Sequence, residues 1–425
     1  MTQINKFWMT FLLVGIFILT CCNNIFAAEQ GVHTSNSDSI FKAYLKEHNI
    51  ETTLNNKVKI LKSGHEKFID LFAEIEKAKH HIHLEYFNFR NDSIANCLFD
   101  LLAKKAAEGI EVRALFDAFG NCSNNQPLKK KHLKEIRKKG IEIQAFDPFK
   151  FPWINHAFHR DHRKIAIIDG EVGYTGGMNI ADYYINGLPE IGEWRDMHIR
   201  IEGKAVSKLQ DIFLDMWNNS TQQTVGGKEY YPYGTDSIHQ LNEGKEVAII
   251  DRHPKRTKKL MRRAYAKAIE SANSNIQIIN PYFTPTRIIK KAIKKASQKG
   301  VKVEIMIPSK SDIPFTPDAA MYIANNLRKK GADIYIFHGG FHHSKIMMID
   351  SLYCTVGSTN LNSRSLRYDY EVNAFIFDKA TTEELMHIFK EDQKESTLLT
   401  AEMYKKRSLW KKFAGWFAHL FTPFL

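Results

Sequence analysis

The chain has 425 residues, 44% of them hydrophobic and 25% charged, which is enough to bury a full core and to form two domains of ordinary size. Lysine and arginine outnumber aspartate and glutamate by 60 to 47, giving a formal net charge of +13. This composition excludes a disordered chain and indicates an anionic partner, either lipid headgroups or nucleic acid, unless the lysines of the helical stretches only face solvent. The five cysteines have no paired spacing, which counts against a disulfide framework and a zinc site.

The N-terminus carries an uncharged apolar segment, from Phe7 to Cys22, directly after Lys6. The segment is short for a helix that spans a bilayer and has the length of the apolar part of an export signal. We therefore expect residues 1–28 to be a signal-like or membrane-anchor segment; a retained anchor, a cleaved signal and a lipid anchor are all compatible with the residues. Lys6 favours an N-terminus on the inner side of a membrane, with the main body of the chain outside.

One large repeat fills most of the remaining chain. The first copy is expected over 56–222, and its predicted elements are a strand over 81–89, a helix that ends at 104–109, a strand over 110–116, a basic helix over 128–140 and a strand over 141–146. Gly109 and Gly140 follow the two helices, as is usual just beyond a last helical turn. An aromatic-rich insertion at about 148–158 is expected to form a loop over the site described below.

A polar, glycine-rich stretch at 223–245 is the predicted linker to the second copy, which is expected over 246–395. The second copy repeats the order of elements, with a strand over 276–283, a helix over 288–300, a strand over 301–307, a helix over 319–331 and a strand over 332–337. This alternation predicts the α/β fold class: two tandem α/β halves, each a mixed sheet flanked by helices, related by a pseudo-two-fold axis.

The chain ends in a predicted amphipathic tail over 396–425. One stripe of this helix holds Trp410, Phe413, Phe417, Leu420 and Phe421. Such a stripe either docks the helix on the domain or suits a lipid interface.

Each copy also contains a buried strand with a His-x-Lys-x4-Asp motif, at His162, Lys164 and Asp169 and again at His343, Lys345 and Asp350. Residues two apart in a strand point to one side, so the histidine and lysine of each motif share a face. The residues between lysine and aspartate are nearly all apolar, as in a central strand covered on both faces. The aspartates fall on the opposite face beside a strong turn signal, so they either shape a turn or take part in the chemistry directly.

Two such pairs in equivalent repeat positions predict an arrangement in which both histidines face one phosphorus atom. One neutral imidazole can attack and form a phosphohistidine, while the protonated other imidazole gives its proton to the leaving alcohol. The two lysines would hold the non-bridging oxygens as negative charge builds. This chemistry requires neither a metal nor a cofactor.

The segments after the motifs supply supporting residues. A Gly-Gly-x-Asn stretch in the first copy matches a Gly-Ser-x-Asn stretch in the second; glycine lets a phosphate approach backbone N–H groups, and asparagine adds a donor. Each half also has a later carboxylate, which either orients an imidazole by accepting its second N–H or forms a surface ion pair. The residues predicted to bind phosphate or support the site are Gly177, Asn179, Ser358, Asn360, Asp196 and Glu371.

On these residues the chain resembles the phospholipase D superfamily, which is defined by paired His-x-Lys-x4-Asp motifs, and within it the bacterial cardiolipin synthases. The resemblance covers nearly all of 80–378, and its matching segments are 162–164, 174–179, 194–198, 281–283, 341–345 and 357–365. Two features depart from it. Arg160-Asp161 stands where a neutral residue is expected beside His162, and one short apolar segment replaces the two N-terminal membrane helices that such enzymes often have.

The resemblance implies one site between two α/β halves, with His162 and His343 as nucleophile and acid in either order. It predicts a phosphatidyltransferase without a cofactor that makes cardiolipin and glycerol from two phosphatidylglycerols, at the bacterial cell membrane, with anionic phospholipid and the membrane surface as partners. Two alternatives stay open: a phospholipase D that hydrolyses lipid headgroups, and a phosphodiesterase or nuclease. Two motifs in one chain, with both chain ends suited to lipid, count against nucleic acid.

Overall fold

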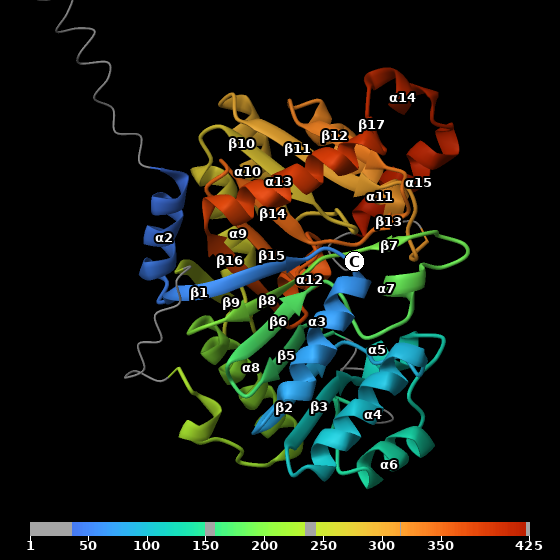
Figure 1. Cartoon of the computed structure of the whole chain (residues 1–425). Coiled ribbons are helices and arrows are strands. Elements are labelled where there is room, and N and C mark those ends of the chain that lie inside the picture. Colours follow the sequence, from blue (N-terminus) through green and yellow to red (C-terminus); the bar gives the residue numbers. More distant parts are fainter. Residues whose placement is uncertain (1–35, 149–157, 234–243, 315, 422–425) are drawn as a thin grey trace, which may run out of the picture.

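The computed structural model describes residues 36–148, 158–233, 244–314 and 316–421. The N-terminal segment at 1–28, most of the insertion at 148–158 and part of the linker at 223–245 therefore lie outside the described residues. The described chain folds into two similar halves, one above the other in Figure 1, which share one mixed sheet.

The first half contains, in chain order, β1 (Thr52–Leu61), α3 (Gly64–Lys77), β2 (His81–Tyr86), α4 (Ser93–Ala107), β3 (Glu111–Asp117), α5 (Ala118–Ser123), α6 (Lys130–Lys138), β4 (Glu142–Phe146), β5 (Lys164–Ile168), β6 (Val172–Gly176), α7 (Tyr183–Asn186), β7 (Trp194–Arg195), β8 (His198–Glu202) and α8 (Ala205–Thr221). A 3-10 turn at Lys228–Tyr230 follows.

The second half repeats this order and adds a tail. It contains β9 (Lys245–Arg252), α9 (Leu260–Ser271), β10 (Asn275–Ile279), α10 (Arg287–Gln298), β11 (Lys302–Pro308), α11 (Thr316–Arg328), β12 (Asp333–Phe337), β13 (Phe341–His342), β14 (Ile346–Ile349), β15 (Tyr353–Gly357), α12 (Ser363–Arg367), β16 (Glu371–Phe377), α13 (Lys379–Lys394), β17 (Ser396–Leu398), α14 (Ala401–Lys406) and α15 (Leu409–Leu420).

The order of strands in the sheet shows the internal symmetry. It reads β17-β12-β11-β10-β14-β15-β16-β9-β1-β8-β6-β5-β2-β3-β4, so that equivalent strands lie at equal distances on either side of the β9–β1 pair. Strands β2, β3 and β4 are parallel to one another, as are β10, β11 and β12, while the motif strands β5 and β14 run antiparallel to β2 and β10. The predicted pair of α/β halves with a mixed sheet is confirmed.

Local sequence explains most of these elements. The helices and strands predicted in each half are present, and Gly109, Gly140, Gly300 and Gly331 all have positive φ just beyond their helices. These values, between 86° and 99°, lie in a region that L side chains rarely adopt, which is why glycine ends each helix.

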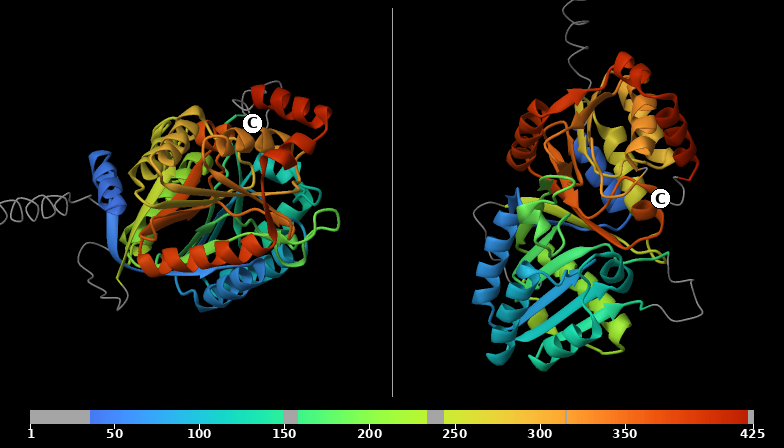
Figure 2. Two further views of the ribbon diagram at one scale, coloured as in Figure 1. Left: turned by 90° about the horizontal axis from the view of Figure 1, so that it is seen from above. Right: turned by 90° about the vertical axis from the view of Figure 1, so that its right-hand side faces the viewer.

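The elements at the junction were not predicted. Strands β1 and β9 pair antiparallel and join the halves into one sheet, and α8 and α13 share one continuous apolar core on a face of that sheet. A further helix, α2 (Ser37–Glu47), precedes the first half in the chain but packs on the second, where Phe41 is fully buried beside residues of α9 and β9. Two views turned from Figure 1 show how closely the halves stack (Figure 2).

Candidate active site

The two motifs meet where the halves join. His162 lies just before β5, and its N–H donates to the carbonyl of Tyr370 in the second half at 3.0 Å. In return, the N–H of His343, just before β14, donates to the carbonyl of Arg195 in the first half at 2.7 Å. Strand β7 of the first half also pairs with β13 of the second. Each motif is therefore held in place by the backbone of the opposite half.

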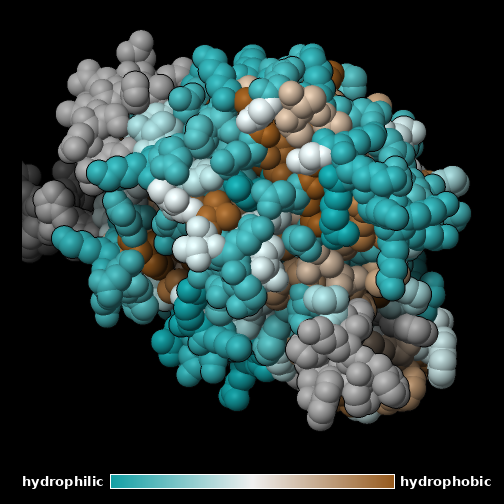
Figure 3. Space-filling model, turned by 90° about the horizontal axis from the view of Figure 1, so that it is seen from below, coloured by the Kyte–Doolittle hydropathy of each residue, from teal (hydrophilic) through white to brown (hydrophobic). Residues whose placement is uncertain are grey.

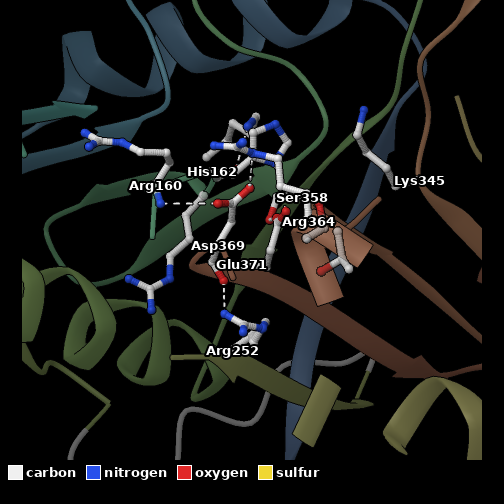
Figure 4. A network of polar contacts seen from close by, with 12 residues as sticks. Arg160, His162, Arg252, Lys345, Ser358, Arg364, Asp369 and Glu371 are labelled. Atoms are coloured by element: carbon white, nitrogen blue, oxygen red, sulfur yellow. Dashed lines mark hydrogen bonds and ion pairs between the residues drawn. The ribbon is translucent and has the colours of Figure 1, made fainter. Parts of the chain in front are cut away.

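Each motif histidine is also paired with a carboxylate from the opposite half. Nδ1 of His162 lies 3.0 Å from Oε1 of Glu371, and Nδ1 of His343 lies 2.7 Å from Oδ2 of Asp196. Both carboxylates are fully buried, so the interpretation of these residues as surface ion pairs is wrong. A carboxylate that accepts Nδ1–H fixes the tautomer and leaves Nε2 with a free electron pair. Figure 4 shows Glu371 between His162 and Ser358.

The motif lysines are buried beside the histidines. Nζ of Lys345 lies 3.1 Å from Nε2 of His343, and Nζ of Lys164 donates to the carbonyl of His162 at 2.5 Å. Both lysines are at most 1% exposed. Two ammonium groups held beside two imidazoles form a compact site for one singly charged phosphodiester.

Burial sets the charge state of these four groups. It lowers the pKa of His162 to about 4, with Lys164 adding to the effect and Glu371 opposing it. Burial and the neighbouring cations, Lys345 first, hold the pKa of His343 well below its usual range. Burial also lowers the pKa of Lys164 to about 7 and that of Lys345 to about 8. Near neutral pH both imidazoles are uncharged, the state in which a histidine can attack phosphorus.

The two carboxylates differ in pKa. Burial raises the pKa of Asp196 to about 6, against the opposing effect of Lys345. Burial acts on Glu371 in the same direction, but His162 and Lys164 outweigh it, and the pKa of Glu371 falls below its usual value. Asp196 is thus the carboxylate of the site that gains a proton in weakly acidic solution.

Gly177 and Ser358, predicted to bind phosphate or to support the site, lie against the two carboxylates. The N–H of Gly177 donates to the carbonyl of Met197 at 3.0 Å, and a Cβ at this position would lie 2.2 Å from Oδ1 of Asp196. The hydroxyl of Ser358 donates to Glu371, and its N–H donates to Val372 at 2.9 Å. Both residues support a carboxylate: glycine leaves room for Asp196, and serine anchors Glu371.

The two asparagines remain candidates for binding phosphate. Asn179 is 5% exposed and Asn360 is 4% exposed. The Oδ1 atoms of both have no hydrogen-bond partner within the part of the chain that the structure describes. A buried amide oxygen needs a donor, so a hydroxyl of a bound ligand would pair with each Oδ1, whereas the Nδ2–H groups of the same amides are the atoms that can donate to phosphate oxygens.

The motif aspartates lie at the far end of the strands from the histidines, roughly 20 Å away at the usual rise of a strand. The carboxylate of Asp169 accepts N–H groups from residues 79, 80 and 81 at 2.8 to 2.9 Å. Asp350 accepts those of residues 273, 274 and 275 at 2.7 to 2.9 Å. Both have positive φ, 55° and 52°. These contacts support the turn role among the two alternatives: each aspartate fastens the turn after its motif strand to the start of the neighbouring strand.

A stability measurement checks this role. Asp169→Ala removes an acceptor of three N–H groups and places alanine at positive φ, so we expect the free energy of unfolding to fall by about 2–4 kcal/mol. The turnover of the protein that remains folded should not change. Asp169→Asn, which keeps one oxygen and tolerates this φ, should lose less. A large loss of turnover in fully folded Asp169→Asn would return the residue to the catalytic group.

The charged pair Arg160-Asp161, which stands where a neutral residue is expected beside His162, has a structural explanation. Nε of Arg160 lies 3.0 Å from Oδ2 of Asp117, with both side chains fully buried, and the N–H of Asp161 donates to the same oxygen at 2.8 Å. The N–H of Arg160 also donates to Asp369 of the second half at 3.2 Å. These residues fix the segment before His162 and tie it to the opposite half (Figure 4).

Lys67 is a supporting residue of the site that was not predicted from the sequence. This fully buried side chain donates to the carbonyls of Met178 at 3.2 Å and Asn179 at 2.9 Å, and burial holds its pKa well below the usual range. It therefore positions the segment that carries Asn179. The signal was available, because Lys67 lies one helical turn before Leu71, on the apolar stripe of α3.

Aromatic rings line the histidines. Phe87 meets His162 edge-on at 5.2 Å between ring centroids, while Trp194 and Tyr282 lie 5.3 and 5.8 Å from His343. The side chain of His162 keeps 16% exposure and that of His343 only 7%. The rings keep the surroundings apolar, which strengthens charge interactions inside the site.

The pKa values predict a bell-shaped pH profile for kcat/KM. The acid limb should fall near pH 6, because Asp196 must be ionised to orient His343 and it gains a proton below its raised pKa. The alkaline limb should fall between about 7 and 8, because the lysines lose their protons above their lowered pKa values. Asp196→Asn, which cannot ionise, should lower kcat/KM at every pH and leave a residual activity without the acid limb. A profile that is flat from pH 5 to pH 9 would contradict this assignment.

The fold and the site together define the class of protein: a duplicated α/β enzyme of phospholipase D type, with paired histidines and lysines between its halves. A family model described as "Cardiolipin synthase, PLD-like domain" matches residues 71–217 and 265–393. A cardiolipin synthase of Listeria monocytogenes is 40% identical over 376 residues, covering 88% of this chain and 76% of the relative. One from Oceanobacillus iheyensis is 37% identical over 394 residues, covering 93% and 78%.

Among solved structures, phosphatidylserine synthase of Haemophilus influenzae has the same fold, with a TM-score of 0.70 at 16% identity, over 90% of this chain and 99% of that one. The chain belongs to the cardiolipin synthase family of phospholipase D-like enzymes, and it is a phosphatidyltransferase.

Proposed function

We propose that the enzyme transfers a phosphatidyl group from one phosphatidylglycerol to another through a phosphohistidine, and releases cardiolipin and glycerol. The observation that carries this proposal is the reciprocal pairing at the site. Each motif histidine is oriented by a carboxylate of the opposite half and lies beside a buried lysine. The relatives named cardiolipin synthase support the choice of lipid.

In the first step, Nε2 of one histidine attacks the phosphorus of the donor lipid. The bond between phosphorus and the headgroup glycerol breaks, and the glycerol oxygen takes a proton from the second histidine. Both imidazoles are neutral in the free site, so one of them must gain a proton when substrate binds. The phosphodiester anion favours this, because its negative charge offsets the lysine ammonium groups that lower the histidine pKa values.

In the second step, the headgroup hydroxyl of another phosphatidylglycerol gives its proton to the second histidine and attacks phosphorus. The phosphorus–nitrogen bond breaks, and the nucleophilic histidine is restored. The lysines, with Asn179 and Asn360 as further donors, stabilise the non-bridging oxygens in both steps.

A product assay tests the proposal. Purified protein incubated with phosphatidylglycerol should form cardiolipin and glycerol in equal amounts. Acid quenching during turnover should trap labelled lipid phosphate on the protein, and His162→Asn and His343→Asn together should abolish the label. Formation of phosphatidic acid without cardiolipin would show that water is the acceptor and would overturn the transfer reaction.

We also propose that the enzyme works at the bacterial cell membrane, with anionic phospholipid as its partner. A lipid substrate and the surplus of basic residues support this. Among the helices of residues 36–421 that the structure describes, none is long and apolar enough to cross a bilayer. Residues 1–28 remain the predicted signal or anchor segment.

A further inference from the structure

Helix α15 is docked on the protein by its small and polar side. Gly415 is the buried residue of the helix, and a Cβ there would lie 2.5 Å from the carbonyl oxygen of Asp318 on α11. The ring of His419 lies 5.2 Å from that of Tyr322, also on α11. Arg407, just before α15, forms an ion pair with the side chain of Asp318. The helix is therefore attached to α11 through contacts that need no large apolar side chain.

The aromatic side of α15 consequently faces away from the protein. Leu409 is 83% exposed and Trp410 is 74% exposed, and the other large apolar side chains of this face are between 44% and 52% exposed. These are Phe413, Trp416, Phe417, Leu420 and Phe421. Surface helices normally turn such a stripe toward the core. The first half presents a different surface: viewed from below, it is largely hydrophilic, with apolar residues in the gaps (Figure 3).

The residues around this aromatic face are mostly basic. Lys405 and Lys406 of α14 and Lys411 of α15 are exposed, whereas Glu402 is the acidic residue of these two helices. Exposed Trp and Phe flanked by lysine are suited to the interface of a membrane with anionic headgroups. The 12 residues of α15 measure about 18 Å, too short for a hydrocarbon core of about 30 Å. The helix has the length and composition to lie flat in the interface.

The position of α15 connects this surface to the active site. The loop before α11 carries Asp312, whose Oδ1 accepts the hydroxyl of Tyr282 at 2.6 Å, and the ring of Tyr282 lies 5.8 Å from that of His343. Ile313 in the same loop is 46% exposed. Helix α15 packs on the helix that follows this loop, at the outer side of the second half (Figures 1 and 2).

We propose that α15 is an interfacial docking helix, which inserts its aromatic face into an anionic lipid surface and holds the neighbouring active-site loop at that surface. The choice of lipid as the occupant rests on the proposed function, because a site that takes two lipid molecules must meet them at a membrane. Because α15 packs on α11 through Gly415, its aromatic face stays free to contact lipid.

Vesicle binding by the full chain tests the proposal. The variant Phe413→Ser, Phe417→Ser, Leu420→Ser removes apolar contacts but keeps Trp410 and Trp416 as reporters. On vesicles of phosphatidylglycerol and phosphatidylcholine containing brominated lipid, tryptophan fluorescence of the unchanged protein should be quenched. The triple variant should lose most of this quenching and bind at least about 30-fold more weakly. Turnover should fall on vesicles but not on monomeric short-chain phosphatidylglycerol.

The matched control is Leu54→Ser, Ile69→Ser, which removes two side chains that are 62% and 59% exposed on the first half. It should bind and quench like the unchanged protein, and the circular dichroism of both variants should be native. Equal loss in the control, or undiminished quenching in the triple variant, would overturn the docking role. If the unchanged protein does not turn over short-chain phosphatidylglycerol, the proposed function is overturned instead. The comparison of vesicle binding between the variants still tests the docking role.

Discussion

Replacing His162 by asparagine, or His343 by asparagine, is expected to lower cardiolipin formation by at least about 10⁴-fold. Each histidine has a different task in one reaction, so neither can carry the reaction alone. Both are held by the opposite half, through Glu371 and Asp196. The measurement is the initial rate of cardiolipin formation from labelled phosphatidylglycerol by each purified variant.

The outcome separates one shared site from two independent sites. Independent sites would leave about half of the rate in each single variant. A mixture of the two variants should also stay inactive, because the residues that complete each site belong to the same chain. Substantial activity in either single variant would contradict the shared site, and recovery in the mixture would show that halves of different chains combine.

Replacing Lys164 by methionine, or Lys345 by methionine, should lower kcat/KM by about 10²–10³-fold, as the loss of one donor to a developing negative charge does elsewhere. The same variants should unfold at a higher temperature. Burial lowers the two pKa values from 10.5 to about 7 and about 8, so the folded protein holds each ammonium less favourably than the unfolded chain does.

The sign of this stability effect follows from proton linkage. Between the lowered pKa and 10.5 the unfolded chain binds more protons, so the free energy of unfolding rises with pH across this window. Below about pH 6, where both lysines are fully charged in the folded protein as well, the full cost of the buried charge is present, and there the methionine variants gain most. Lys59→Met, at a lysine whose side chain is 58% exposed, serves as the control and should change neither activity nor stability appreciably. Methionine variants that unfold at lower temperature would contradict the assigned cost.

The reciprocal construction gives a physical reason for keeping both copies in one chain. Each half alone would contain a histidine and a lysine but not the carboxylate that orients that histidine. The two halves also share the sheet at β9 and β1 and one continuous core beneath α8 and α13. Loss of the contact between halves should therefore remove activity and, because it exposes the shared apolar core, also destabilise both halves.

The orientation of the C-terminal tail and the role of the motif aspartates could be predicted from the sequence only in part. The apolar stripe of the C-terminal tail was visible in the sequence, but its periodicity fits a helix docked by that stripe as well as one that exposes it. The outward orientation depends on Gly415 and the surface of α11, which lie 97 residues apart at their closest contact, Asp318. The turn role of Asp169 and Asp350 was one of two alternatives until their backbone partners were known.

The sequence by itself determined the repeat, the main helices and strands of each half, and the two His-x-Lys pairs. These depend on local properties: periodicity, glycine beyond helix ends, and the alternation of side chains along a strand. Only the tertiary structure decided which carboxylate serves which histidine, because the pairs are 209 and 147 residues apart in the chain. It likewise assigned Gly177 and Ser358 to the carboxylates, and revealed Lys67. Contacts between distant segments follow from how the halves pack, and no local pattern specifies that packing.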